Sequence, residues 1–199
     1  MDTDPKDLVD QAVDAAARST RLNATVAVTV AVLATFMGIC KVKDDNIVQA
    51  MQQAQADKID HWAYYQARNL RQEVAEATAT QLELARSAAA GASQAAAYDQ
   101  TIARYRQLAT EQAQKKETLR HQAEDDQRHY DALNYRDDQF DLSDALLAIA
   151  IAMLAVTALT QLWALYLAAL VPTAFGLLMG LAGLSGWAIH PEALVRLLS

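Results

Sequence analysis

Long uncharged stretches alternate along the chain with one long polar segment. Leu22–Cys40 and Ala145–Ile189 contain no charged residue, whereas residues 43–140 are polar and rich in alanine. A helix of about 19 residues rises roughly 28 Å, which matches the hydrocarbon thickness of a bilayer. The second uncharged stretch is too long for a single crossing of about 20 residues. The pattern therefore predicts an all-α membrane protein with three transmembrane helices.

Pro172 lies near the middle of the second uncharged stretch. Because proline starts a helix more readily than it continues one, we expect two spans, residues 144–168 and 172–190, joined by a tight turn. Ser143 and Asp144 suit the start of the first of these spans. An alternative remains open, in which this block enters the membrane and returns without crossing it.

Gly91 divides the polar segment near its midpoint. Between Lys41 and Pro172 there is no proline, and Gly91 is the only glycine. A helix breaker at this place predicts two helical arms of roughly 70 Å each, folded back on one another as an antiparallel coiled-coil hairpin outside the membrane. The expected organisation is an amphipathic tail over 1–21, a first span over 22–41, the hairpin over 42–141, and the second and third spans with a short C-terminal tail over 142–199.

Both arms carry apolar positions at heptad spacing, with steps of four and three residues. The predicted seam of the first arm consists of Ala63, Ala67, Leu70, Val74, Ala77, Gln81, Leu84 and Ala88. The predicted seam of the second arm consists of Tyr98, Ile102, Tyr105, Ala109, Gln112, Lys116, Leu119, Ala123, Asp126, Tyr130, Leu133, Asp137 and Phe140. Ile47, Met51 and Ala54 follow the same spacing in another register, so we predict a register shift between Ala54 and Ala63.

The seams contain so much alanine and so many polar residues that the hairpin buries little apolar area, and we expect it to pack against copies of itself or a partner. In a hairpin that turns at Gly91, positions whose numbers sum to about 182 lie level with one another, within two to four residues. This rule places Trp62 level with Arg120, Lys58 with Glu124, and His61 with His121. A Trp62–Arg120 cation–π contact or a Lys58–Glu124 ion pair would each contribute roughly 0.5–1 kcal/mol.

His61 and His121 lie among several carboxylates, and imidazole with carboxylate can bind transition metals between helices. Both histidines lie off the predicted seams, so a solvated charged face is the preferred interpretation and a metal site the alternative. The sequence contains no glycine-rich phosphate loop, no nucleophile elbow and no Cys-x-x-Cys pair. We therefore expect neither a cofactor nor an enzymatic activity.

The last span carries small residues at helix-contact spacing. Gly176 and Gly180 form a G-x-x-x-G pair and Gly183 follows them, which is typical of close packing between spans or between subunits. Gln161 is the one strongly polar residue within a predicted span, and we expect it to bond between helices. The net charge of −7 over 199 residues disfavours nucleic acid as a partner, because phosphate binding requires a basic surface.

Residues 25–72 read TVAVTVAVLATFMGICKVKDDNIVQAMQQAQADKIDHWAYYQARNLRQ. This passage resembles a family of bacterial membrane proteins known as domain of unknown function 4337. Its distinguishing part is Trp62-Ala63-Tyr64-Tyr65-Gln66-Ala67-Arg68, where the family more often has lysine in place of Arg68. The resemblance implies a bacterial inner-membrane protein with three spans, and it brings no activity and no catalytic residue. Trp62, Tyr64 and Tyr65 cannot all face one arm, so they either contact another subunit or protein or bridge the register shift.

These observations favour a non-enzymatic, homo-oligomeric scaffold or adaptor that acts through its hairpin. Its expected partners are the lipid bilayer, further copies of itself, and another membrane or cytoplasmic protein. The alternative is an oligomeric channel or transport component whose spans line a path. The hairpin side carries more of the basic residues near the span ends, which favours a cytoplasmic hairpin. These residues are Lys41, Lys43, Arg128, Arg136 and Arg196, against Lys6, Arg18 and Arg21 on the other side.

Overall fold

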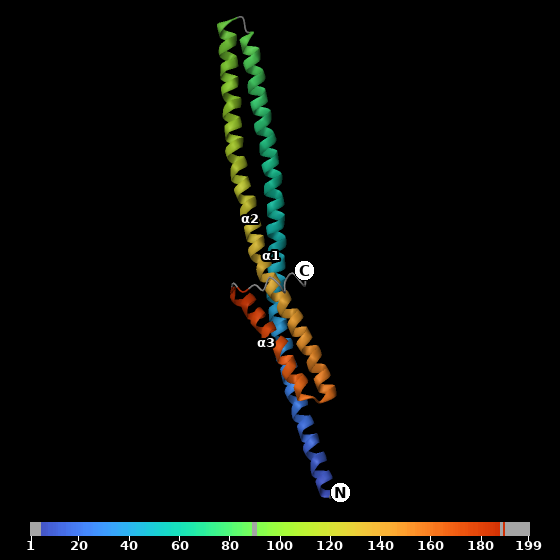
Figure 1. Cartoon of the computed structure of the whole chain (residues 1–199). Helices are drawn as coiled ribbons and strands as arrows, with labels where there is room; N and C mark the ends of the chain where they lie inside the picture. Colours follow the sequence, from blue (N-terminus) through green and yellow to red (C-terminus); the bar gives the residue numbers. More distant parts are fainter. Residues whose placement is uncertain (1–4, 89–90, 188, 190–199) are drawn as a thin grey trace. The chain divides into compact units, whose positions relative to one another are not determined.

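A computed structural model describes residues 5–88, 91–187 and 189, and this part of the chain contains three helices and no strand. The helices are α1 (Pro5–Ser87), α2 (Ala92–Thr160) and α3 (Trp163–Ser185), as Figure 1 shows. The prediction of an all-helical chain is confirmed. The chain divides into two compact units. We call Met1–Gln49 with Leu133–Ser199 the apolar unit, and Ala50–Ala132 the arm unit.

Each of the three helices contains an apolar stretch that is long enough to cross a membrane. The apolar unit has a core to which all three helices contribute. Its buried members are Leu22, Val26, Leu33, Leu147, Ala150, Leu154 and Ala169. The hydroxyl groups of Thr29 and Tyr166 lie 3.1 Å apart and join α1 to α3 beside this core. The apolar side chains that predicted three spans therefore also pack the three helices against one another.

The turn between α2 and α3 lies at Gln161 and Leu162, so the prediction of a turn at Pro172 is wrong. Gln161 has a positive φ of 58°, and α3 runs through Pro172 without a break. In an apolar helix the hydrogen bond that proline cannot make is tolerated when neighbouring groups compensate. Pro172 leaves the carbonyl of Ala168 without its helical donor, and beside it the hydroxyl of Thr173 donates to the carbonyl of Ala169 at 2.8 Å.

Gly186 ends α3 in the left-handed conformation, with φ 71° and ψ 30°. Its backbone N–H donates to the carbonyl of Ala182, which is the usual way in which glycine caps a helix. The expected end of the last span at residue 190 lies outside the described residues.

Gly91 lies in the connection between α1 and α2. The carbonyl of Gly91 accepts a 3.0 Å hydrogen bond from the backbone N–H of Ala95, in the first turn of α2. A Cβ at Gly91 would meet no heavy atom within 4 Å. Packing therefore does not require a glycine at this position, and Gly91 acts here as a poor helix former.

Candidate functional site

In the arm unit, α1 and α2 lie side by side (Figure 1) and contact each other through one unbroken heptad stripe of α1. The buried and half-buried members of this stripe are Met51, Ala54, Lys58, His61, Tyr65, Arg68, Gln72, Ala75, Ala79 and Leu82. The spacing continues from Met51 and Ala54 without interruption. The predicted register shift between Ala54 and Ala63 is therefore wrong.

Polar bonds between the two helices follow this stripe. Lys58 Nζ donates to Gln127 Oε1 at 2.7 Å, and Arg68 donates to Gln112 Oε1 at 3.0 Å. Three further bonds join His61 to Asp126 at 2.6 Å, Asn69 to Lys116 at 2.9 Å and Glu83 to Arg106 at 2.6 Å. Hydrogen bonds between side chains of α1 and α2 thus join the two helices, in addition to apolar packing.

The seam predicted for the second arm is confirmed. Its residues within the arm unit are buried or half-buried from Tyr98 to Tyr130, and Ala123 is fully buried. This seam includes the buried Gln112 and the half-buried Lys116 and Asp126, whose polar groups need partners away from water. Arg68 and His61 of the α1 stripe and the adjacent Asn69 supply these partners, which explains why the helices meet there.

The apolar stripe predicted as the α1 seam lies on the outside instead. Its side chains are exposed, including Leu70 at 61%, Val74 at 56% and Leu84 at 69%. We call the residues Ala63, Ala67, Leu70, Val74, Ala77, Gln81 and Leu84 the outer stripe. Leu70 and Val74 also border an open apolar hollow of about 280 Å³, which Tyr105 and Leu108 of α2 complete. The arm unit therefore presents a heptad surface that its own chain does not cover.

Trp62, Tyr64 and Tyr65 face three different surroundings. Tyr65 is half-buried against α2, where Lys116 Nζ lies 5.9 Å from the centre of its ring. Trp62 packs edge-on against Tyr65, with ring centres 5.2 Å apart. Tyr64 is 63% exposed. Because the register does not shift, these aromatic residues have no shift to bridge.

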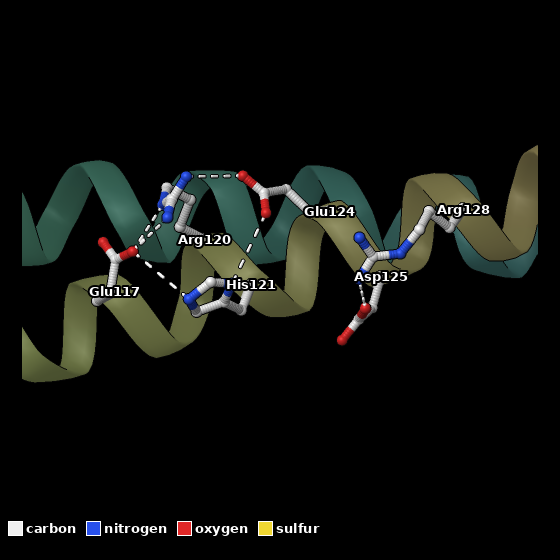
Figure 2. Close-up of polar contacts among 6 residues, drawn as sticks. All are labelled: Glu117, Arg120, His121, Glu124, Asp125 and Arg128. Atoms are coloured by element: carbon white, nitrogen blue, oxygen red, sulfur yellow. Dashed lines mark hydrogen bonds and ion pairs between the residues drawn. The ribbon is translucent and has the colours of Figure 1, made fainter.

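Arg120 is held by carboxylates of its own helix (Figure 2). It pairs with Glu117 and, at 2.9 Å, with Glu124. The hydrogen bond from Arg120 lowers the pKa of Glu117 below its usual range. At this level the cation–π contact is made by Lys116 and Tyr65, and Lys58 bonds to Gln127, about one turn from Glu124. The facing residues are therefore offset by a few positions from the expected Trp62–Arg120 and Lys58–Glu124 pairs, which is within the two to four residues allowed for the pairing.

His61 and His121 have separate partners. His61 bonds to Asp126, whereas His121 is exposed and lies 3.5 Å from Glu117 and 3.7 Å from Glu124 on its own helix. Figure 2 shows His121 between these two carboxylates, with the Asp125–Arg128 ion pair further along α2. Within the described residues, no group of three or more His, Cys, Asp or Glu side chains is arranged to hold a metal ion.

The glycines of α3 lie in contacts within the apolar unit. A Cβ at Gly176 would lie 2.8 Å from Leu147, and one at Gly180 would lie 2.6 Å from Phe36 and 2.8 Å from Ser143. At Gly183 the ring of Phe140 fills the space, 2.9 Å from the position of a Cβ. Of the two expected roles, the structure thus places the glycines between helices of one chain.

Gln161 lies in the turn between α2 and α3 and not within a span. Its side-chain nitrogen donates to Asn23 Oδ1 of α1 at 2.8 Å and also bonds to the carbonyl of Ala158. Gln161 therefore forms a hydrogen bond to another helix, as expected, but it does so from the turn that joins α2 to α3.

Two side chains of α2 bond to carbonyl groups in the last turn of α3 and just after it, and sequence reasoning missed them. Arg136 donates to the carbonyl of Gly183 at 2.8 Å. The amide nitrogen of Gln139, a residue only 1% exposed, donates to the carbonyls of Trp187 at 2.8 Å and Ile189 at 2.7 Å. The last carbonyls of a helix, such as that of Gly183, have no partner within it. The two donors therefore fix the end of α3 and the residues after it onto α2.

Sequence reasoning also missed a group of carboxylates in the apolar unit. Asp44 of α1 is 4% exposed and pairs with Lys41 at 2.8 Å. It faces Asp137 of α2, whose pKa is raised to about 7, first by burial and then by a hydrogen bond to Asp44 and by neighbouring negative charges. Burial and the charge of Asp44 also raise the pKa of Asp141. The pairing rule could have indicated this contact, because the residue numbers 44 and 137 sum to 181, close to the value of about 182 that the rule uses.

A small cavity of about 20 Å³ lies beside these carboxylates. Its polar lining comes from Lys41, Asp44, Asp141, Ser143 and Asp144. This volume is about that of one water molecule.

Comparison with known proteins identifies one family. The family model described as Domain of unknown function (DUF4337) matches residues 22–186, which include the arm unit and the apolar stretch of every helix. No curated protein and no solved structure matches the chain. The match covers most of the 199 residues. The chain therefore belongs to the family described as Domain of unknown function (DUF4337).

Proposed function

We propose that the protein is a non-enzymatic membrane scaffold that self-associates through the outer stripe. In the proposed topology three helices span the bacterial inner membrane, and the arm unit forms a coiled-coil hairpin outside it. Three apolar helices of sufficient length support the spans. The observation that carries the function is the exposure of an apolar heptad stripe on α1. Exposed apolar surfaces of this kind mark sites of protein contact.

The residues of the outer stripe fit a second copy of α1. Copies with the same topology in one membrane present α1 in the same direction, so their stripes meet in parallel. Leu70 and Leu84 then occupy d positions and Val74 an a position. A β-branched residue at a with leucine at d favours parallel pairs of helices. Gln81 occupies another a position, where a polar residue fixes the register of the pair.

The neighbouring hollow supports contact with a second copy. Leu70 and Val74 border it from α1, while Tyr105 and Leu108 border it from α2. A leucine side chain from the neighbouring stripe can enter such a hollow as a knob enters a hole. Association would thus cover both the stripe and the hollow in one contact.

The mass of the complex extracted from native membranes tests this function. The wild-type protein is expected to contain at least two copies, and the Leu70→Lys/Val74→Lys variant a single copy. Both positions are more than half exposed, so the substitutions leave the fold of one chain intact. Helix content measured by circular dichroism should be unchanged in this variant.

A matched control adds two lysines elsewhere on the exposed surface. Gln114 and Gln122 of α2 are exposed, and the Gln114→Lys/Gln122→Lys variant should keep the wild-type mass. A wild-type protein that is monomeric in native extracts would contradict the proposal. So would a Leu70→Lys/Val74→Lys variant that keeps the wild-type mass.

We place the arm unit in the cytoplasm. Lys41, Lys43, Arg128 and Arg136 lie near the span ends on its side, and basic residues concentrate on the cytoplasmic side of bacterial membrane proteins. A phosphatase that is active only in the periplasm, inserted at Gly91, should therefore be inactive, whereas a cytoplasmic fluorescent reporter at the same place should be bright. The opposite pair of results would reverse the orientation.

The channel alternative depended on polar side chains within the spans, with Gln161 foremost. Gln161 bonds to Asn23 and Ala158 in the turn between α2 and α3. This placement removes its main support, and scaffold function remains our proposal.

A further inference from the structure

Asp44 has a buried carboxylate oxygen without a hydrogen-bond donor. The side chain is 6% exposed, and its Oδ2 accepts a 2.8 Å bond from Lys41 Nζ. The other oxygen, Oδ1, is buried and has no partner. Leaving a charged oxygen buried and unpaired is costly, and such groups in native proteins nearly always have a donor. The local structure thus lacks one hydrogen-bond donor at Asp44.

Asp137 of α2 faces Asp44, and a hydrogen bond to Asp44 is among the causes that raise its pKa. When both groups are ionised, neither can donate, and their like charges repel. When one of them carries a proton, its O–H group can donate to the other carboxylate. A single proton would therefore change this contact from repulsion to a hydrogen bond between α1 and α2.

We propose that Asp44 and Asp137 form a proton-binding site, in which one shared proton supplies the donor that Asp44 Oδ1 lacks. The ligand is a proton because Lys41 already provides the cation that pairs with Asp44. The cavity of about 20 Å³ beside Asp44 is large enough for one water molecule.

The groups around the site hold the proton there. On α1 they are Cys40, Lys41 and Asp45, and on α2 they are Asp138, Asp141 and Asp144. Residues Trp163–Ser185 of α3 contain no charged side chain, and the titratable Tyr166 of α3 is bonded to Thr29. One lysine thus faces several carboxylates. The excess negative charge favours the protonated form, in agreement with the raised pKa values of Asp137 and Asp141.

The site makes stability depend on pH in a defined direction. The pKa of Asp137 is about 7 in the folded chain against 3.8 for an ordinary aspartate. Between these values the folded chain holds a proton that the unfolded chain has lost. Stability should therefore fall as the pH rises from about 4 to about 7, and this loss is complete above that range.

Infrared spectroscopy of the full chain in lipid nanodiscs tests the proposal. A protonated carboxyl group has a C=O band that ionised carboxylates lack. The wild-type protein should show this band at pH 6 and lose it with a midpoint near pH 7. Asp137→Asn and Asp44→Asn should each abolish it. Asp141→Asn should keep the band and lower its midpoint by about one pH unit, because it removes a neighbouring negative charge.

Two further measurements separate proton binding from a structural role. The amide introduced by Asp137→Asn can donate a hydrogen to Asp44, so this variant should be more stable than the wild type at pH 8 and lose the wild-type slope between pH 5 and 7. The exposed Asp125, which pairs with Arg128 on its own helix, provides the control, and Asp125→Asn should keep both the band and the slope. Absence of the wild-type band at pH 6, or its survival in Asp137→Asn, would overturn the proposal.

Discussion

Gly176→Val should loosen α3 from α2 and lower the free energy of unfolding by about 3 kcal/mol. The new Cβ would lie 2.8 Å from two carbon atoms of Leu147 and 3.3 Å from the Cβ of Leu146. Leu147 is fully buried in the core of the apolar unit and has no free space to enter. The shift would also strain the 2.8 Å bond that Ser143 donates to the carbonyl of Gly176.

Thermal unfolding in detergent measures this effect. Tryptophan emission and the reaction of Cys40 with a maleimide are the two readouts. Cys40 is the only cysteine and is buried, so its reaction reports opening of the apolar unit. A drop in the midpoint of about 6–10 °C is expected. Gly38 of α1 is the matched control, because a Cβ there would meet nothing within 4 Å. If Gly38→Val and Gly176→Val unfolded at the same temperature, close packing at Gly176 would not contribute to stability.

Gln139→Leu should cost about 2 kcal/mol, because it removes the donor of the Ile189 carbonyl and one of the two donors of the Trp187 carbonyl, which keeps the backbone N–H of Ile189 at 2.9 Å. Gln139→Glu should cost more at pH 7, since an ionised carboxylate would face two carbonyl oxygens. At low pH the protonated glutamate can donate again, so Gln139→Glu should regain stability as the pH falls. A larger loss of stability for Gln139→Glu than for Gln139→Leu at pH 7, with recovery at low pH, is specific to a side chain that acts as a hydrogen-bond donor.

The unfolding midpoints of the two variants at pH 5 and pH 8 check this prediction. Gln122→Leu changes an exposed glutamine of the same helix and should have no effect at either pH. An equal loss for Gln139→Leu and Gln139→Glu at both pH values would show that shape matters at this position and that hydrogen bonding does not.

The helical class and the α2 seam could be predicted because each depends on a local pattern. Helical periodicity and the scarcity of glycine and proline indicate helices, and the α2 seam combines its apolar residues in one stripe. On α1 two stripes compete, and hydrophobicity alone favours the wrong one. The outcome depends on polar groups of α2 such as Gln112 and Asp126, which bond to Arg68 and His61. The hydrophobic pattern of one helix does not show which polar groups of the other helix require hydrogen-bond partners.

The turn between α2 and α3 was misplaced for a related reason. Proline is a strong signal in water-soluble helices, but a helix in apolar surroundings can continue through it. The observed turn at Gln161 is marked only by a polar pair, Thr160 and Gln161, within an otherwise apolar run. The carboxylate pair of Asp44 and Asp137 was open to prediction, because both residues follow the heptad spacing of their helices and lie level across the arms.

The brevity of this turn has a consequence for biosynthesis. Only Gln161 and Leu162 separate α2 from α3, and Gln161 is tied to Asn23 of α1 by a 2.8 Å bond. Two residues cannot reach across a bilayer. In the proposed topology, the apolar end of α2 therefore cannot settle in the lipid before α3 has been synthesised. The two helices must leave the insertion machinery together, as a preformed pair that meets α1 already in the membrane.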